Sequence, residues 1–195
     1  IKSITTDKDI VNLKSNNIND TNYFEVFKDF QEYYLNDNKS IITEEFNGYT
    51  NSMTTCGCCG TTIHNVQTFN ILFFPLEEVR KFMNYRHNNV GIKDCFKYYE
   101  KQSIFPSFYC NKCKYLCQSL NSSKLISAPQ TLIINLNRGR GLEYNVNIVF
   151  EEYLNLREYI FTPNSPYYYE LTGVICHFGS NDEGGHFIAY CKNSN

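Results

Sequence analysis

The sequence predicts an α+β fold, in which helices come first along the chain and strands follow. Aromatic residues after Asp20 recur every three or four positions, which is the period of a helix. From Tyr115 onward, short β-rich runs are separated by turn residues. Because helices do not alternate with strands along the chain, the pattern disfavours a doubly wound parallel sheet.

The predicted helices lie mainly in the first half of the chain. We expect a short helix within residues 1–19, which are polar with scattered apolar positions. A longer helix should begin at Asp20, whose carboxylate can accept hydrogen bonds from first-turn amides, and end at residues 36–38. Residues 77–89 are expected to form a helical insertion or a loop, and residues 92–102 an amphipathic helix.

The remaining segments are predicted to be extended. Residues 41–55 lead into the first cysteine cluster, and the run that follows this cluster ends at Pro75. Strands are predicted for residues 66–76, 115–126, 131–136, 144–150, 168–178 and 186–192.

Composition excludes several classes of protein. The chain has 195 residues, of which 42% are hydrophobic and 16% aromatic, so it can bury a core. With 18 basic and 20 acidic side chains its formal charge is −2, which gives no basic field for nucleic acid. No apolar run approaches the ~20 residues that cross a bilayer. Since the sequence starts at Ile1 and stops at Asn195, we expect it to be a segment of a longer protein.

Nine cysteines are present, and their clustering is more informative than their number. Three lie between Cys56 and Cys59, and three more between Cys110 and Cys117. An odd count without an export signal disfavours a fully disulfide-bonded secreted framework. The clusters indicate metal binding in a reducing, intracellular compartment, in the cytoplasm or nucleus.

Two Cys-x-x-Cys knuckles predict a structural zinc site. The knuckles are Cys56–Cys59 and Cys110–Cys113, and their four thiolates would complete a tetrahedral shell. A closed shell leaves no position for substrate, so the ion should have a structural role. Cys58 could replace Cys59 as a ligand, and a chance spacing of buried thiols is the alternative interpretation.

Among the four histidines, His186 is the candidate for catalysis. It follows Gly184 and Gly185 and begins an apolar strand, where a general base would be held rigidly. Paired glycines also let another backbone approach closely. We expect surface positions for His64 and His87, and a structural role for the fourth histidine, at position 177.

The order of these motifs resembles the ubiquitin-specific proteases, the large cysteine-peptidase family of deubiquitinases. Residues 169–192 are similar to the His box of that family, and residues 129–138 are similar to its Leu-x-x-x-Leu-Lys-Arg strand. The two knuckles match its zinc-binding fingers, and Phe46 and Gly48 precede the first knuckle as in the family. Residues 20–24 look like a diverged form of its Asp-Ala-x-Glu-Phe helix start.

The resemblance implies a partial papain-like cysteine peptidase fold of the ubiquitin-specific protease type, with zinc-bound β fingers. Residues 1–45 would be a helical remnant of the thumb, residues 46–128 mostly the fingers, and residues 129–195 the palm with the His box. It also implies that His186 is the general base for a cysteine nucleophile. Gly184 and Gly185 would leave room for the Gly-Gly tail of ubiquitin to pass the histidine. Ubiquitin and ubiquitinated proteins would be the partners.

The departures from the family pattern leave alternatives open. The family nucleophile lies in a Gly-Asn-x-Cys box upstream of the long helix, and no cysteine precedes Cys56. We therefore expect this segment to lack the nucleophile and to be inactive alone. A catalytically inactive ubiquitin-binding scaffold of the same fold is one alternative. A papain-like peptidase that uses Cys59 with His186 is another, although it leaves the second knuckle unexplained.

Overall fold

The computed structural model describes residues 11–14, 20–84, 89–139, 146–179 and 185–193. Its largest described sheet has five strands in the order β1-β3-β2-β7-β6, and every neighbouring pair is antiparallel. The strands are β1 (Val11–Lys14), β2 (Gly48–Cys56), β3 (Thr62–Phe69), β6 (Ser103–Cys110) and β7 (Tyr115–Ser127). The short helix predicted within residues 1–19 is wrong where β1 lies, because pairing with β3 holds this segment extended.

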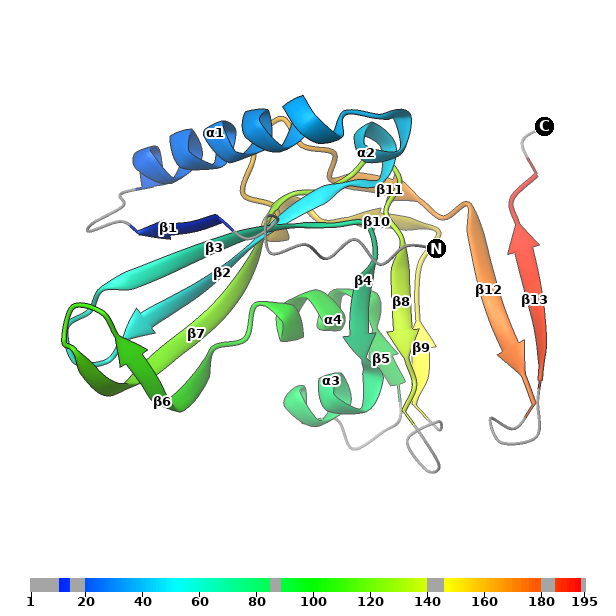
Figure 1. Ribbon diagram of the computed structural model, residues 1–195. Coiled ribbons are helices and arrows are strands. Elements are labelled where there is room, and N and C mark those ends of the chain that lie inside the picture. Colours follow the sequence, from blue (N-terminus) through cyan, green and yellow to red (C-terminus); the bar gives the residue numbers. More distant parts are fainter. Residues whose placement is uncertain (1–10, 15–19, 85–88, 140–145, 180–184, 194–195) are drawn as a thin grey trace.

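Helix α1 (Asp20–Asn38) lies across one face of this sheet (Figure 1), as its aromatic period predicts. Phe27 and Phe30 are buried against Tyr49, Val66 and Ile126, which come from β2, β3 and β7. Burying each aromatic side chain contributes roughly 1.5–3 kcal/mol. These contacts fix the helix on the strands that lead to both cysteine turns.

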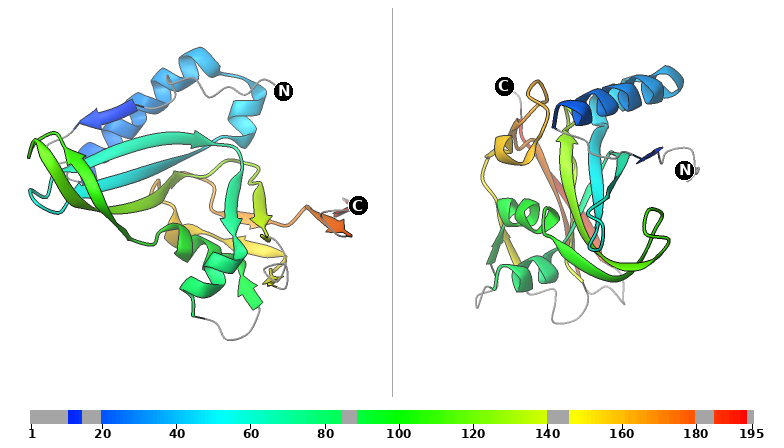
Figure 2. Two further views of the ribbon diagram at one scale, coloured as in Figure 1. Left: turned by 60° about the horizontal axis from the view of Figure 1, so that its bottom comes forward. Right: turned by 90° about the vertical axis from the view of Figure 1, so that its left-hand side faces the viewer.

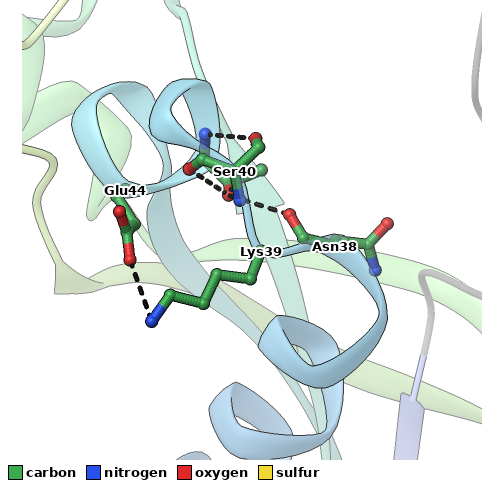
Figure 3. Close-up of polar contacts among 5 residues, drawn as sticks. Asn38, Lys39, Ser40 and Glu44 are labelled. Atoms are coloured by element: carbon green, nitrogen blue, oxygen red, sulfur yellow. Dashed lines mark hydrogen bonds and ion pairs between the residues drawn. The ribbon is translucent and has the colours of Figure 1, made fainter.

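A second helix, α2 (Ile41–Phe46), stands where we predicted an extended segment. Its start is fixed by a capping box, in which the Thr43 backbone N–H donates to Ser40 Oγ at 3.2 Å and the Ser40 N–H donates to Thr43 Oγ1 at 2.9 Å. Lys39 and Glu44 form an ion pair of 3.3 Å over the same turn (Figure 3). Local capping thus outweighs the β-branched composition of Ile41 and its neighbours, and β2 begins only at Gly48.

The main hydrophobic core lies beside the large sheet, among short helices and two parallel strand pairs. Pairs β4–β8 and β5–β9 carry helices α3 and α4 against the end of β7. The elements are β4 (Leu72–Pro75), α3 (Leu76–Phe82), β5 (Asn89–Gly91), α4 (Ile92–Tyr99), β8 (Ile134–Asn137) and β9 (Asn147–Val149). The largest fully buried side chains here are Phe74, Leu76, Phe96, Leu125 and Leu156, together with Val79, Val90 and Val146.

Two antiparallel pairs complete the chain. Strands β10 (Tyr153–Asn155) and β11 (Tyr168–Glu170) pair beside the main core, and β12 (Gly173–Phe178) pairs with β13 (His186–Cys191). The β12–β13 pair projects away from the large sheet in Figure 1 and in the left view of Figure 2. Among the described helices, none has the length and apolar character needed to cross a membrane.

Candidate metal centre and histidine site

The four knuckle cysteines meet because two hairpin turns lie on adjacent parts of the large sheet. Cys56 ends β2 and Cys110 ends β6, and each begins a tight turn into the next strand. The Gly60 N–H donates to the Cys56 carbonyl at 2.9 Å, and Gly60 has a φ of 70°. The Lys114 N–H donates to the Cys110 carbonyl at 2.8 Å, with a φ of 64° at Lys114. Both turns therefore use a left-handed residue to close around their cysteine pair.

The sulfur atoms of these cysteines have the separations of a tetrahedral thiolate site. Cys56 Sγ lies 3.9 Å from Cys113 Sγ, and Cys59 Sγ lies 3.6 Å from Cys110 Sγ. All four sulfurs lie within 4.8 Å of one another. A zinc ion about 2.3 Å from each sulfur requires tetrahedral edges of roughly 3.8 Å. The cluster can therefore hold one metal ion. Its fourth member is Cys59, the preferred ligand, and not Cys58, which the sequence had left as an alternative.

Hydrogen bonds in this cluster lower the pKa of two of its ligands, Cys56 and Cys59, the latter mainly through the Thr61 hydroxyl. A hydrogen bond from the backbone N–H of Cys59 lowers the pKa of the Cys56 thiol to about 6. A hydrogen bond with the Cys59 sulfur raises the pKa of the Cys113 thiol. Cys56 and Cys110 are also almost completely buried. Thiolate is the form that binds metal, so Cys56 is prepared for ligation before an ion arrives.

His186 is the first residue of β13, and its side chain is exposed. It pairs with Phe178 across the hairpin, and the next pair joins His177 to Phe187. Since successive residues of a strand point to opposite faces, His177 and His186 lie on opposite faces of this two-stranded ribbon. The ring centroid of His177 lies 4.6 Å from that of Phe187, and the structural role expected for this histidine stays a prediction.

Gly185 precedes His186 and lies beside the His177 ring, whereas Gly184 lies outside the described residues. A Cβ at position 185 would lie 1.9 Å from His177 Nε2 and 2.8 Å from the Phe178 carbonyl oxygen. Because Gly185 has no side chain, β12 can approach the start of β13, where His186 lies. His87 also falls outside the described residues, and His64 is half-buried on β3, where its Nδ1 lies 3.0 Å from Asn51 Nδ2.

The end of β13 is anchored to the rest of the molecule by Lys192, a residue that sequence reasoning did not single out. Its ammonium group forms ion pairs with Glu152 and Glu170, and these hydrogen bonds raise the Lys192 pKa. Its backbone N–H donates to the Thr172 carbonyl at 2.8 Å. The Tyr169 hydroxyl, on β11 next to Glu170, donates to the Pro129 carbonyl at 2.6 Å. No local sequence signal marks Lys192, because Glu152 and Glu170 lie 40 and 22 residues away along the chain and only the folded strand arrangement brings them together.

The two candidate sites lie at opposite ends of the molecule. The cysteine turns occupy the tip of the β2–β3 and β6–β7 hairpins, and the β12–β13 pair lies at the far side of the main core (Figures 1 and 2). Cys59 belongs to the four-thiol cluster and is not brought to His186. The papain-like alternative, in which these two residues form a catalytic pair, is therefore wrong.

Comparison with known proteins gives the family of this chain. The family model for ubiquitin carboxyl-terminal hydrolases matches residues 9–195, almost the entire sequence. The chain belongs to the ubiquitin carboxyl-terminal hydrolase family. The resemblance to ubiquitin-specific proteases seen in the sequence motifs is thereby confirmed.

Yeast relatives of this family match most of the chain. Ubiquitin carboxyl-terminal hydrolase 4 of Saccharomyces cerevisiae (strain YJM789) is 28% identical over 185 residues, which cover 83% of this chain and 19% of the relative. Ubiquitin carboxyl-terminal hydrolase 5 of S. cerevisiae is 30% identical over 184 residues, covering 83% and 22%. The probable hydrolase 16 of Schizosaccharomyces pombe is 26% identical over 161 residues, covering 80% and 34%. The chain thus spans about a fifth to a third of the length of these relatives.

Solved structures show the same fold. The SAGA module of Ubp8, Sgf11, Sus1 and Sgf73 bound to ubiquitin aldehyde matches with a TM-score of 0.61 and 22% identity, covering 89% of this chain and 41% of the other. The same module bound to monoubiquitin matches with a TM-score of 0.64 and 23% identity, covering 89% and 40%. The predicted α+β fold of the ubiquitin-specific protease type is confirmed.

Proposed function

We propose that the complete protein is a cysteine-type deubiquitinase that removes ubiquitin from protein conjugates through a thioester. The observation that carries this proposal is the placement of His186 in a member of this family. It stands exposed at the start of a strand whose other end is fixed by Lys192, beside a glycine that admits close approach. A rigidly held imidazole at an open edge is suited to general-base catalysis.

The reaction follows from the chemistry of a Cys–His pair. His186 takes the proton of a cysteine thiol, and the thiolate attacks the carbonyl carbon of the glycine that ends ubiquitin. The C–N bond to the substrate lysine breaks as the imidazolium protonates the leaving amine. Water then attacks the thioester with His186 as base, which releases the ubiquitin carboxylate and the free thiol. Gly184 and Gly185 would admit the narrow tail of ubiquitin beside the histidine.

Part of the proposal is that the nucleophile is not among these 195 residues. Six of the nine cysteines lie in or beside the cluster at the hairpin tip, and Cys95 is buried in the main core. Within the described part of the chain, no hydrogen bond joins a cysteine to His186. The 195 residues alone should therefore not turn over conjugates.

The fingers would hold the globular body of ubiquitin, with zinc as their structural ion. Cys56, Cys59, Cys110 and Cys113 fit that ion by sulfur spacing, and zinc would hold the two hairpin turns together. We assign residues 1–45 to the thumb remnant, 46–128 to the fingers and 129–195 to the palm. Nine free cysteines suit a reducing, intracellular compartment, and a charge of −2 supports a protein partner over nucleic acid.

The test of this proposal is hydrolysis of an isopeptide-linked ubiquitin conjugate by the complete protein and by His186→Ala and His186→Gln variants. Loss of the general base should reduce turnover by about 10²–10⁴-fold. Because the side chain is exposed, the free energy of unfolding should change by less than about 0.5 kcal/mol, which separates a catalytic from a folding effect. Near-normal turnover by both variants would contradict the assignment of His186.

A further inference from the structure

A second group of three thiols adjoins the four-cysteine cluster. The sulfurs of Cys56, Cys58 and Cys117 all lie within 4.8 Å of one another. Cys56 belongs to both groups, so six of the nine cysteines form one continuous array of sulfur atoms. The first site alone leaves Cys58 and Cys117 without a role.

The pairing of β2 with β7 creates this second group. Cys56 is paired with Ser119 across the two strands, and the Gly57 N–H donates to the Gln118 carbonyl at 2.8 Å. A Cβ at Gly57 would lie 3.0 Å from that oxygen, so the glycine permits the close approach of the turn to β7. The approach places Cys58, one residue further along the turn, beside Cys117.

The burial of the three thiols suits an ion that enters from solvent. Cys56 and Cys117 retain only 1% and 3% of their exposed surface, whereas Cys58 is exposed. Cys117 Sγ lies 3.8 Å from the Tyr115 carbonyl oxygen, which keeps its sulfur at the strand and next to the turn. A buried free thiol such as Cys117 is usually an inert small apolar group. Here, however, the exposed Cys58 and the shared ligand Cys56 lie close to it.

We propose that Cys56, Cys58 and Cys117 bind a second thiophilic divalent ion of the zinc and cadmium class, with the Cys56 thiolate bridging the two ions. Soft thiolate ligands select such ions, and solvent would complete the fourth position. Binding releases the thiol protons of Cys58 and Cys117, so the two charges of the ion balance the two thiolates that it adds. This site goes beyond the proposed function, which uses one structural ion.

The experiment is a metal titration of the reduced chain with Cd²⁺, followed by native mass spectrometry and by ¹¹³Cd resonance. We expect two bound ions and two resonances for the wild-type chain. Cys58→Ser, which changes an exposed side chain, and Cys117→Ser should each bind one ion and keep one resonance. Cys191→Ser, at the exposed end of β13, is the matched control and should still bind two ions.

The outcomes separate this site from the first one. A wild-type chain that binds a single ion, unchanged by Cys58→Ser, would overturn the second site and leave the four-cysteine site intact. Two ions retained in both Cys58→Ser and Cys117→Ser would also overturn it, because the second ion would then lie elsewhere. No binding by the wild-type chain would contradict both sites.

Discussion

At the scale of single residues, Gly185 decides how closely β12 and β13 can approach beside His186. The ring of His177 and the carbonyl of Phe178 occupy the space that a side chain would need. The ring could move, but the carbonyl belongs to the paired backbone. The identity of residue 185 therefore controls the geometry at the start of β13 as well as the access expected for a ubiquitin tail.

We predict that Gly185→Ala loosens the β12–β13 pair. Overpacking of this kind typically costs 1–3 kcal/mol, which corresponds to a rise in local opening of about 5- to 150-fold. Amide hydrogen exchange of β12 and β13 measures the effect. Gly173→Ala is the matched control in the same hairpin, because its Cβ would meet no atom closer than 3.4 Å. Equal protection in the two variants would show that position 185 tolerates a side chain.

At the scale of elements, the sequence predicts the helices and strands that are determined by their own local residue pattern. The aromatic period predicts α1 and the β-rich run over residues 115–126 predicts β7, and both elements match the predictions closely. Helix α2 was missed because a two-residue capping box outweighs its composition, and β1 because its partner strand is distant in sequence. Cysteine spacing grouped the four ligands, but the neighbourhood of Cys58 and Cys117 depends on the register between β2 and β7.

The capping box of α2 can be tested directly. Ser40→Ala removes the acceptor for the Thr43 amide and should lower the free energy of unfolding by about 1 kcal/mol. Lys39→Ala is the control, since it removes only an exposed ion pair with Glu44 and should cost at most about 0.5 kcal/mol. Denaturant unfolding measures both variants. Equal stability of the two would mean that the cap does not hold α2.

If the four-cysteine cluster holds the proposed zinc ion, removal of that ion should disorder the two hairpin turns first. Structural zinc contributes roughly 10–16 kcal/mol to the folding of small metal modules, and the two hairpin turns here share few other buried side chains. A chelator, or Cys113→Ser, should expose the turns at residues 57–61 and 111–114 to limited proteolysis, while Cys191→Ser should not. Unchanged cleavage at both turns after chelation would argue against a structural ion.

At the scale of the whole molecule, the metal cluster and the histidine hairpin stand at opposite ends of one continuous arrangement of sheet and core. The large sheet extends the cysteine turns away from the main core, and Lys192 fixes the histidine hairpin to its other side. This separation is what the proposed function requires, in which the body of ubiquitin is held at the cysteine turns and its tail reaches His186. Because the cysteine cluster and the histidine hairpin are far apart in the fold, their relative placement could not be predicted from sequence spacing.

The most direct test of the proposed function is the reaction of the complete protein with ubiquitin that carries a C-terminal electrophile. We predict a covalent adduct on a cysteine of the complete protein and none on the 195-residue chain. A correctly folded complete protein that binds ubiquitin but forms no adduct would contradict the account and favour an inactive ubiquitin-binding scaffold.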